Sequence, residues 1–222
     1  MAGSDSIAAD LTLEELRLVL APEVARAAAF DGWNGEALQQ AAAALNINGD
    51  VARLAIPGGP MDLIDAWVQS IDAAMREAFG GDAFAGVKIR ERIRMLVQFR
   101  LDAVRGQEEA LRRALTIQAM PQNLARALRM GWRSADIMWR LAGDTATDYN
   151  HYSKRATLGA IYGATLSSFI DDTSDGKADT AAFLDRRIDG VMRFEKAKAK
   201  WLKPREHFDV ARFLGRLRYP TS

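Results

Sequence analysis

Apolar residues recur at helical spacing along nearly the whole of this chain, and no segment alternates apolar and polar residues as a half-buried strand does. Glycine and proline occur at intervals that separate helices and do not build hairpins. At 222 residues the chain is long enough to bury a hydrophobic core that needs no disulfide or metal ion for stability. We therefore predict an all-α protein of about ten helices: 11–30, 34–45, 49–56, 59–79, 86–105, 107–119, 121–142, 145–171, 179–203 and 205–218.

Composition narrows the cellular setting. The chain has no cysteine, which excludes disulfides, thiolate catalysis and cysteine-ligated metals and is typical of a reducing compartment. No run of about 18 apolar residues is present that would span a membrane. The N-terminal residues lack a secretory pattern, and acidic residues precede the first basic one, Arg17, unlike an organelle transit peptide. We therefore expect a protein of the bacterial cytoplasm.

The N-terminal region has the order of helices and turns that is typical of a helix-turn-helix. Turns at 31–33 and 46–49 separate three helices, and small residues at Ala41 and Ala42 suit two helices that cross steeply at short range. This pattern at the head of an all-helical chain resembles the plan of TetR-like regulators. The resemblance implies a degenerate helix-turn-helix over 1–60 and a ligand-binding and dimerisation body over 61–203.

Charge argues against DNA binding by this region. Residues 1–60 contain three basic and eight acidic residues, a net charge of −5, and the recognition segment 48–59 offers Arg53 as its one basic residue. A surface that repels phosphates gains nothing from counterion release. We therefore expect no nucleic-acid partner. A TetR-type ligand-responsive transcriptional repressor remains the alternative function.

The residue patterns of catalysis are missing from the sequence. The two histidines are His151 and His207, and no Glu-x-x-His pair of the kind that helical di-iron sites use is present. Glycine-rich phosphate loops and nucleophile elbows are also absent. We therefore expect no catalytic residues, no metal and no enzyme activity of its own. An enzyme that uses carboxylates and tyrosines is the other open alternative.

Bulky and flexible apolar residues recur at helical spacing through the body. Such stripes are typical of a plain core, but methionine and tryptophan also line adaptable ligand cavities. We predict a lipid-binding pocket that needs no cofactor and holds an isoprenoid or a phospholipid. The predicted lining is Met95, Leu96, Phe99, Ile117, Met120, Leu124, Leu128, Trp132 and Ile161.

The last predicted helix, 205–218, combines an apolar stripe with arginines. Residues 186–218 hold eleven basic and four acidic residues, a net charge of +7. This pattern favours a helix that lies in a membrane interface next to anionic lipids, and packing within a dimer is the alternative. The residues predicted to contact the membrane are Val210, Arg212, Phe213, Leu214, Arg216 and Leu217.

The stretch 138–155 joins a helix end at Gly143 to a helix start that is dense in aromatic and charged residues. Such residues anchor protein interfaces, although a helix start with half-buried tyrosines would look the same. The stretch belongs to a longer pattern: Asp136-x-Met-Trp139, Ala142-Gly-Asp-x-x-Thr-Asp-Tyr-Asn-x-Tyr152, Lys154-Arg155 and Ala156-x-Leu-x-Ala-Ile-Tyr162. Arg92-Ile-Arg-Met-Leu96, Met120-Pro121 and Phe183-Leu184-x-x-Arg187-Ile-x-x-x-Met192 extend it.

This pattern resembles the ubiquinone (coenzyme Q) biosynthesis accessory protein family, numbered nine in that pathway. The resemblance is strongest from about 87 to 195 and departs at His151, where animal members have tryptophan. It implies a TetR-like homodimer that binds lipid and docks the di-iron hydroxylase of the pathway. The implied docking residues are Asp136, Met138, Trp139, Asp148, Tyr152 and Arg155.

The resulting hypothesis is an accessory protein attached peripherally to the inner face of the bacterial membrane through 205–218. It would hold a polyprenylated quinone intermediate in its apolar body and present the head group to the hydroxylase docked at 136–155. The partners expected are thus the hydroxylase, membrane lipids and a second copy of the chain.

Overall fold

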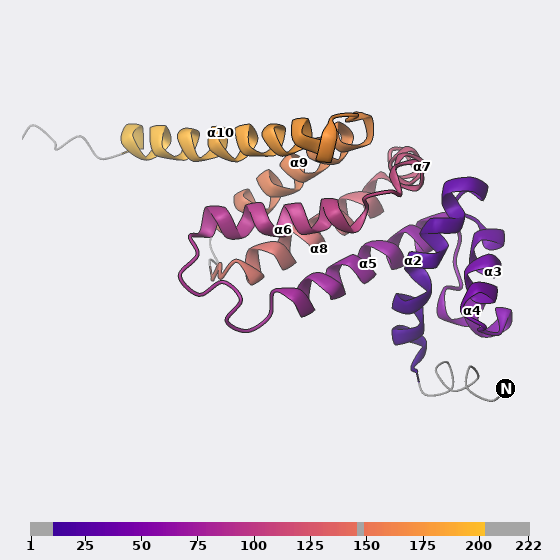
Figure 1. The fold of residues 1–222 in the computed structure, drawn as a ribbon. Helices are drawn as coiled ribbons and strands as arrows, with labels where there is room; N and C mark the ends of the chain where they lie inside the picture. The colour runs from indigo at the N-terminus through magenta and orange to yellow at the C-terminus, as the bar shows by residue number, and fades with distance from the viewer. Residues whose placement is uncertain (1–10, 146–148, 203–222) are drawn as a thin grey trace, which may run out of the picture. The chain divides into compact units, whose positions relative to one another are not determined.

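The structure is a computed structural model, and it describes residues 11–145 and 149–202. These residues form nine α-helices and a short 3-10 turn, and no strand (Figure 1). The all-α class is therefore confirmed, while the predicted helix 205–218 lies outside the described residues. The helices are α2 (Leu13–Asp31), α3 (Gly35–Ala44), α4 (Gly49–Ala55), α5 (Pro60–Ala78), α6 (Ile89–Ala103), α7 (Glu108–Gln118), α8 (Leu124–Leu141), α9 (Tyr149–Asp171) and α10 (Ala178–Leu202), with the 3-10 turn at Asp175–Lys177.

The chain divides into a compact unit that ends at Asp185 and a second unit that begins at Arg186. The helix-turn-helix, the cavity and the adjoining surface described below lie in the first unit. The boundary between the regions 1–60 and 61–203 stays a prediction.

Helices α2, α3 and α4 form the predicted helix-turn-helix. The side chains of Asn34 and Asn48 cap α3 and α4 by accepting hydrogen bonds from the first backbone N–H groups of each helix. Between them, Asn46 takes a positive φ of 55°, which reverses the chain in a tight turn. Ala41 and Ala42 are buried, as close packing of two helices requires.

Helix α2 begins with the predicted capping box. The Thr12 hydroxyl accepts a hydrogen bond from the Glu15 backbone N–H at 3.3 Å, and the Glu15 carboxylate accepts one from the Thr12 N–H at 2.8 Å. Replacing Thr12 by alanine removes the hydroxyl and leaves the Glu15 backbone N–H to water. We expect Thr12→Ala to lower the free energy of unfolding by about 1 kcal/mol in urea titration. The exposed Thr116→Ala is the control, since its hydroxyl bonds within α7 to the Arg112 carbonyl, and an equal loss would contradict the capping role.

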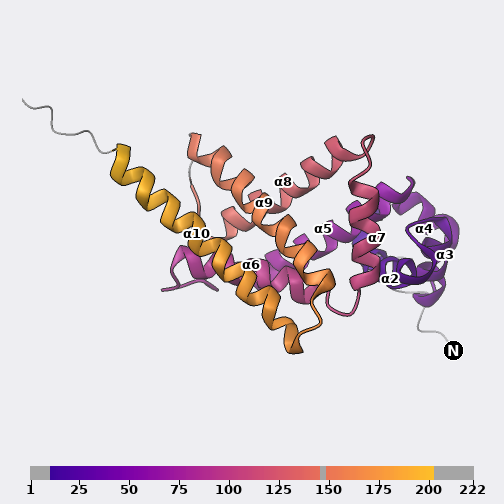
Figure 2. The ribbon, with the colours of Figure 1, turned by 90° about the horizontal axis from the view of Figure 1, so that it is seen from above.

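Trp33 connects the helix-turn-helix to the rest of the unit. Its side chain is buried, its Nε1 donates to the Ala110 carbonyl of α7 at 2.9 Å, and its ring lies 5.3 Å from that of Trp67 in α5. Helices α5, α6, α7, α8 and α9 pack on one another beyond this junction, with α8 in contact with both α5 and α9 (Figure 2).

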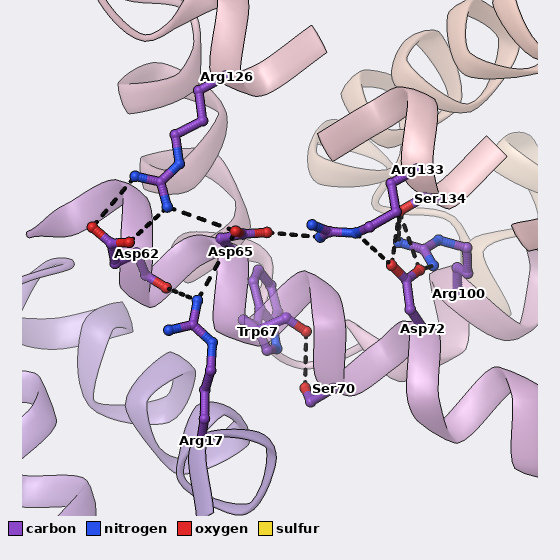
Figure 3. A network of polar contacts seen from close by, with 10 residues as sticks. All are labelled: Arg17, Asp62, Asp65, Trp67, Ser70, Asp72, Arg100, Arg126, Arg133 and Ser134. Carbon is purple, nitrogen blue, oxygen red and sulfur yellow. Dashed lines mark hydrogen bonds and ion pairs between the residues drawn. The ribbon is translucent and has the colours of Figure 1, made fainter. Parts of the chain in front are cut away.

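A row of carboxylates on α5 fastens α8 to it (Figure 3). Arg126 reaches Asp62 at 2.7 Å, and Arg133 reaches Asp65 at 2.7 Å and Asp72 at 3.5 Å. The hydrogen bond from Arg126 is the main reason why the pKa of Asp62 is below its usual value. These ion pairs between α5 and α8 hold α8 in position. Helix α8 in turn forms one wall of the cavity described next.

Candidate functional site: an apolar cavity and the adjoining surface

The first unit contains an open cavity of about 610 Å³ between α5, α6, α7, α8 and α9. This volume lies in the range of small-molecule sites. Its walls are almost entirely apolar and include two tryptophans, Trp67 and Trp132. Most of the lining is Ile64, Trp67, Val68, Ile71, Val104, Leu111, Ala114, Leu115, Ala127, Leu128, Met130, Gly131, Trp132, Ala156, Gly159, Ala160, Gly163 and Leu166.

The cavity exists because one face of α9 carries small residues. Ala156, Gly159, Ala160 and Gly163 follow the spacing i, i+3, i+4, i+7, which places them along one side of the helix. A Cβ atom built on Gly159 or Gly163 would meet no atom within 4 Å. Space that larger side chains would fill elsewhere in a core is therefore left open here.

The structure places the nine predicted lipid-lining residues in different surroundings. Leu128 and Trp132 line the cavity. Leu96 is buried in the core, Phe99 packs edge-on against Phe79, and Ile117 lies beside a smaller hollow near Trp33. The remaining four also lie outside the cavity wall: Met95, Met120, Leu124 and Ile161.

Seven of the nine residues therefore lie outside the wall of this cavity, and their part in lipid binding stays a prediction. The predicted lining residues have bulky side chains, which fill space, whereas this cavity forms where the residues of α9 are small. The signal that could have located it was the run of alanine and glycine on α9, at positions where a buried helix normally carries leucine or isoleucine.

One part of the cavity wall is polar and fully buried. Arg100 of α6 is 1% exposed and forms an ion pair with Asp72, and its Nη2 lies 3.2 Å from the Ser134 hydroxyl (Figure 3). The Tyr162 ring lies 5.0 Å from the guanidinium. Burial disfavours the charged form, but Tyr162 and Asp72 outweigh it and raise the pKa of Arg100, so this arginine stays protonated.

The predicted docking residues that the structure describes gather where α8 and α9 adjoin. The Arg155 Nε donates to the Asp136 carboxylate at 2.6 Å, and its Nη1 donates to Asp144 at 3.1 Å. Trp139 is half-buried, and its Nε1 donates to the Lys154 carbonyl at 3.0 Å. The ion pairs thus join the end of α8 to the start of α9 across the turn at Gly143, whose φ of 90° is the left-handed conformation predicted there.

Exposure divides these residues into two groups. Tyr152 is 61% exposed, and its ring lies 6.0 Å from that of Trp132. Met138 and Arg155 are buried, at 0% and 2% exposure. These two side chains lie beneath the surface formed by the exposed residues. The docking role of the whole set stays a prediction. Asp148, like the residues predicted to contact the membrane, lies outside the described residues.

Asp136 supplies a pH-dependent contribution to stability. Burial opposes its ionisation, but the hydrogen bond from Arg155 and the charges of Arg140 and Arg155 bring the pKa of Asp136 below its usual value. A lowered pKa stabilises the folded chain above the unfolded pKa, about 3.9, and this stabilisation is lost as the pH falls through the folded pKa. We expect the melting temperature difference between the wild type and Asp136→Asn to be larger at pH 7 than at pH 3. An equal difference at both pH values would contradict this.

None of the helices in residues 11–145 and 149–202 is long and apolar enough to cross a membrane. Within the same ranges, no three histidine or carboxylate side chains are grouped so that they could hold a metal ion.

Comparison with solved structures defines the class of protein. The structure resembles a TetR transcriptional regulator from Nitrosomonas europaea, with a TM-score of 0.62 and 25% identity, over 85% of this chain and 99% of that one. The chain is thus an all-helical protein with a TetR-like fold, as its sequence predicts.

Comparison of sequences gives the family. Residues 124–195, which cover α8, α9 and much of α10, match the model of the COQ9 family. The mitochondrial ubiquinone biosynthesis protein COQ9 of rat is 31% identical over 176 residues, and that of human is 28% identical over 175 residues; each alignment covers 72% of this chain. The chain belongs to the COQ9 family. It spans about half the length of these relatives, 54% of the rat and 52% of the human protein.

Proposed function

We propose that this protein is a lipid-binding accessory protein of ubiquinone biosynthesis, which holds a polyprenylated quinone intermediate for a partner hydroxylase. The observation that carries the proposal is the open apolar cavity. Each methylene of an isoprenoid tail exposed to water costs about 0.8 kcal/mol, so a protein that takes such a molecule from a bilayer must offer it an apolar path. The family membership supports the choice of a quinone intermediate over other lipids.

The surface at the junction of α8 and α9 is the proposed docking site for the hydroxylase. Trp132 belongs both to the cavity wall and to this surface, and its ring contacts the exposed Tyr152. A partner that covers Tyr152 would therefore lie beside the cavity. Aromatic residues of this kind are frequent anchors of interfaces.

A pull-down of the di-iron hydroxylase by the full chain tests the docking site. Tyr152→Ala is expected to weaken capture about tenfold or more, since anchor residues contribute about 2 kcal/mol or more. Phe30→Ala is the matched control, because Phe30 is 83% exposed but lies on α2. Equal capture by the wild type and both variants would rule out this surface.

A second copy of the chain and the membrane complete the proposed assembly. The small residues of α9 would let the α9 helix of a second copy approach closely and cover the open side of the cavity. Sedimentation equilibrium of the full chain tests this, and the mass of a dimer is expected.

The predicted helix 205–218 would hold the dimer on the inner face of a bacterial membrane. Its basic and apolar composition supports binding to anionic lipid.

Extraction from vesicles tests lipid binding directly. The full chain is mixed with phosphatidylcholine vesicles that contain a polyprenylated benzoquinone, and the vesicles are sedimented. The quinone is expected in the supernatant in proportion to the protein. Quinone that stays in the pellet at every protein concentration would contradict the proposal.

The alternative function, a ligand-responsive repressor, is favoured by the likeness to a TetR transcriptional regulator. Against it, Arg53 in α4 is paired with Asp50 at 2.5 Å, so the basic residue of that helix already has a carboxylate partner. Binding to genomic DNA fragments whose affinity falls steeply with salt would favour the repressor.

A further inference from the structure

The buried polar wall of the cavity carries a donor without a partner. In the described part of the chain, the Nε–H of Arg100 donates to no acceptor within hydrogen-bond distance, although the residue is only 1% exposed and lines the cavity. A buried N–H without a partner costs about 1–3 kcal/mol, so such a group is normally satisfied by something. Its position on the wall makes a bound ligand the natural partner.

The charges around the cavity are already balanced. Arg100 is paired with Asp72, and the other cationic residue of the wall, Arg155, is paired with Asp136 and Asp144. A carboxylate or phosphate placed here would meet no net positive charge and would lose its hydration. A neutral oxygen that accepts a hydrogen bond carries no such penalty.

Arg100, Tyr162 and Ser134 belong to the same polar patch. The Ser134 hydroxyl donates a hydrogen bond to the Asp72 carboxylate at 3.1 Å. Tyr162 lines the cavity, and its ring faces the Arg100 guanidinium. The exposed end of the cavity wall, at Leu128 and Trp132, is apolar. The cavity therefore has a buried end suited to an oxygen and an exposed end suited to hydrocarbon.

From this arrangement we infer that the cavity selects amphiphiles with a neutral, oxygen-bearing head, such as a quinone or phenol, and binds them head first at Arg100 and Tyr162. The tail then leaves past Leu128 and Trp132. This inference rests on the proposed lipid binding and adds its specificity and direction. It also means that the head is sheltered while the ligand is held, and must leave this position before a partner can act on it.

Three probes with the same chain length test the inference by equilibrium dialysis against the full protein, delivered from cyclodextrin: decyl-1,4-benzoquinone, decylbenzene and decanoate. The wild type is expected to bind the quinone about tenfold more tightly than decylbenzene, the effect of one hydrogen bond from a charged donor. Decanoate is expected to bind no better than decylbenzene.

Two variants locate the effect. Tyr162→Phe removes the hydroxyl and keeps the ring, and Arg100→Lys keeps a charge opposite Asp72 and removes the Nε donor. Each is expected to reduce the preference for the quinone several-fold while decylbenzene binding is unchanged, and a thermal melt checks that each variant is folded. Val68→Ala, on the apolar wall, is the control and should lower the affinity for both probes by the same factor.

The outcomes separate this inference from the proposed function. Equal binding of the quinone and decylbenzene by the wild type would leave a lipid-binding cavity and overturn the head-group site. Tightest binding of decanoate would overturn the neutral head. If none of the probes bound, lipid binding itself would fail.

Discussion

Replacing Asp72 by alanine is expected to lower the free energy of unfolding by about 3–5 kcal/mol, because the change leaves the Arg100 guanidinium charged and buried without its carboxylate. The two side chains are 1% and 2% exposed, so water cannot take the place of Asp72. Urea unfolding followed by circular dichroism measures the loss. A decrease below about 1 kcal/mol would show that the pair contributes little.

The same helix provides the matched control. Asp62 and Arg126 also form an ion pair between α5 and α8, but their side chains are 31% and 34% exposed. We expect Asp62→Ala to cost about 0–1 kcal/mol, since solvent screens exposed pairs. The double variant Asp72→Leu with Arg100→Met should recover most of the stability, because an apolar pair leaves no buried charge.

Replacing Gly159 by leucine is expected to reduce binding of a polyprenylated quinone tenfold or more without loss of stability. The new side chain would occupy space along the cavity wall where no atom lies within 4 Å of the added Cβ. Displacing about two methylenes of the ligand costs about 1.6 kcal/mol, which is more than a tenfold change in affinity. Leucine also favours a helix over glycine, so the melting temperature should not fall. Vesicle extraction gives the affinity.

Gly190→Leu is the control for this variant. Gly190 is also helical and has open space around its Cβ position, but it lies on α10 and not on the cavity wall. Sedimentation of both variants checks that the subunit mass is unchanged. If Gly159→Leu bound quinone as the wild type does, the cavity could not be the lipid site.

Much of the fold was predictable because its signals are local. The Thr12–Glu15 capping box, the left-handed Gly143 and the alternation of apolar periodicity with turns each depend on residues within a few positions of one another. Helix ends differ by a few residues, as at α8, which begins at Leu124 where the predicted helix begins at 121. The family pattern was likewise readable from contiguous segments.

The site was predictable only in part because it depends on contacts between distant segments. Asp136 and Arg155 lie together as the shared pattern suggested, but the pairing of Asp72 with Arg100 joins residues 28 positions apart that no local spacing marks. The burial of Met138 is likewise a property of the packed helices. A cavity is the most difficult feature to predict, since it is defined by the side chains that are missing from a wall.

The central claim is that the cavity holds an isoprenoid lipid, and native mass spectrometry of the full chain purified from a ubiquinone-producing bacterium tests it most directly. The account predicts a bound mass that lipid extraction identifies as a polyprenylated quinone or its precursor, and that is lost in Gly159→Leu and kept in Gly190→Leu. A protein that carries no lipid, or that carries the same lipid in all three forms, would contradict it.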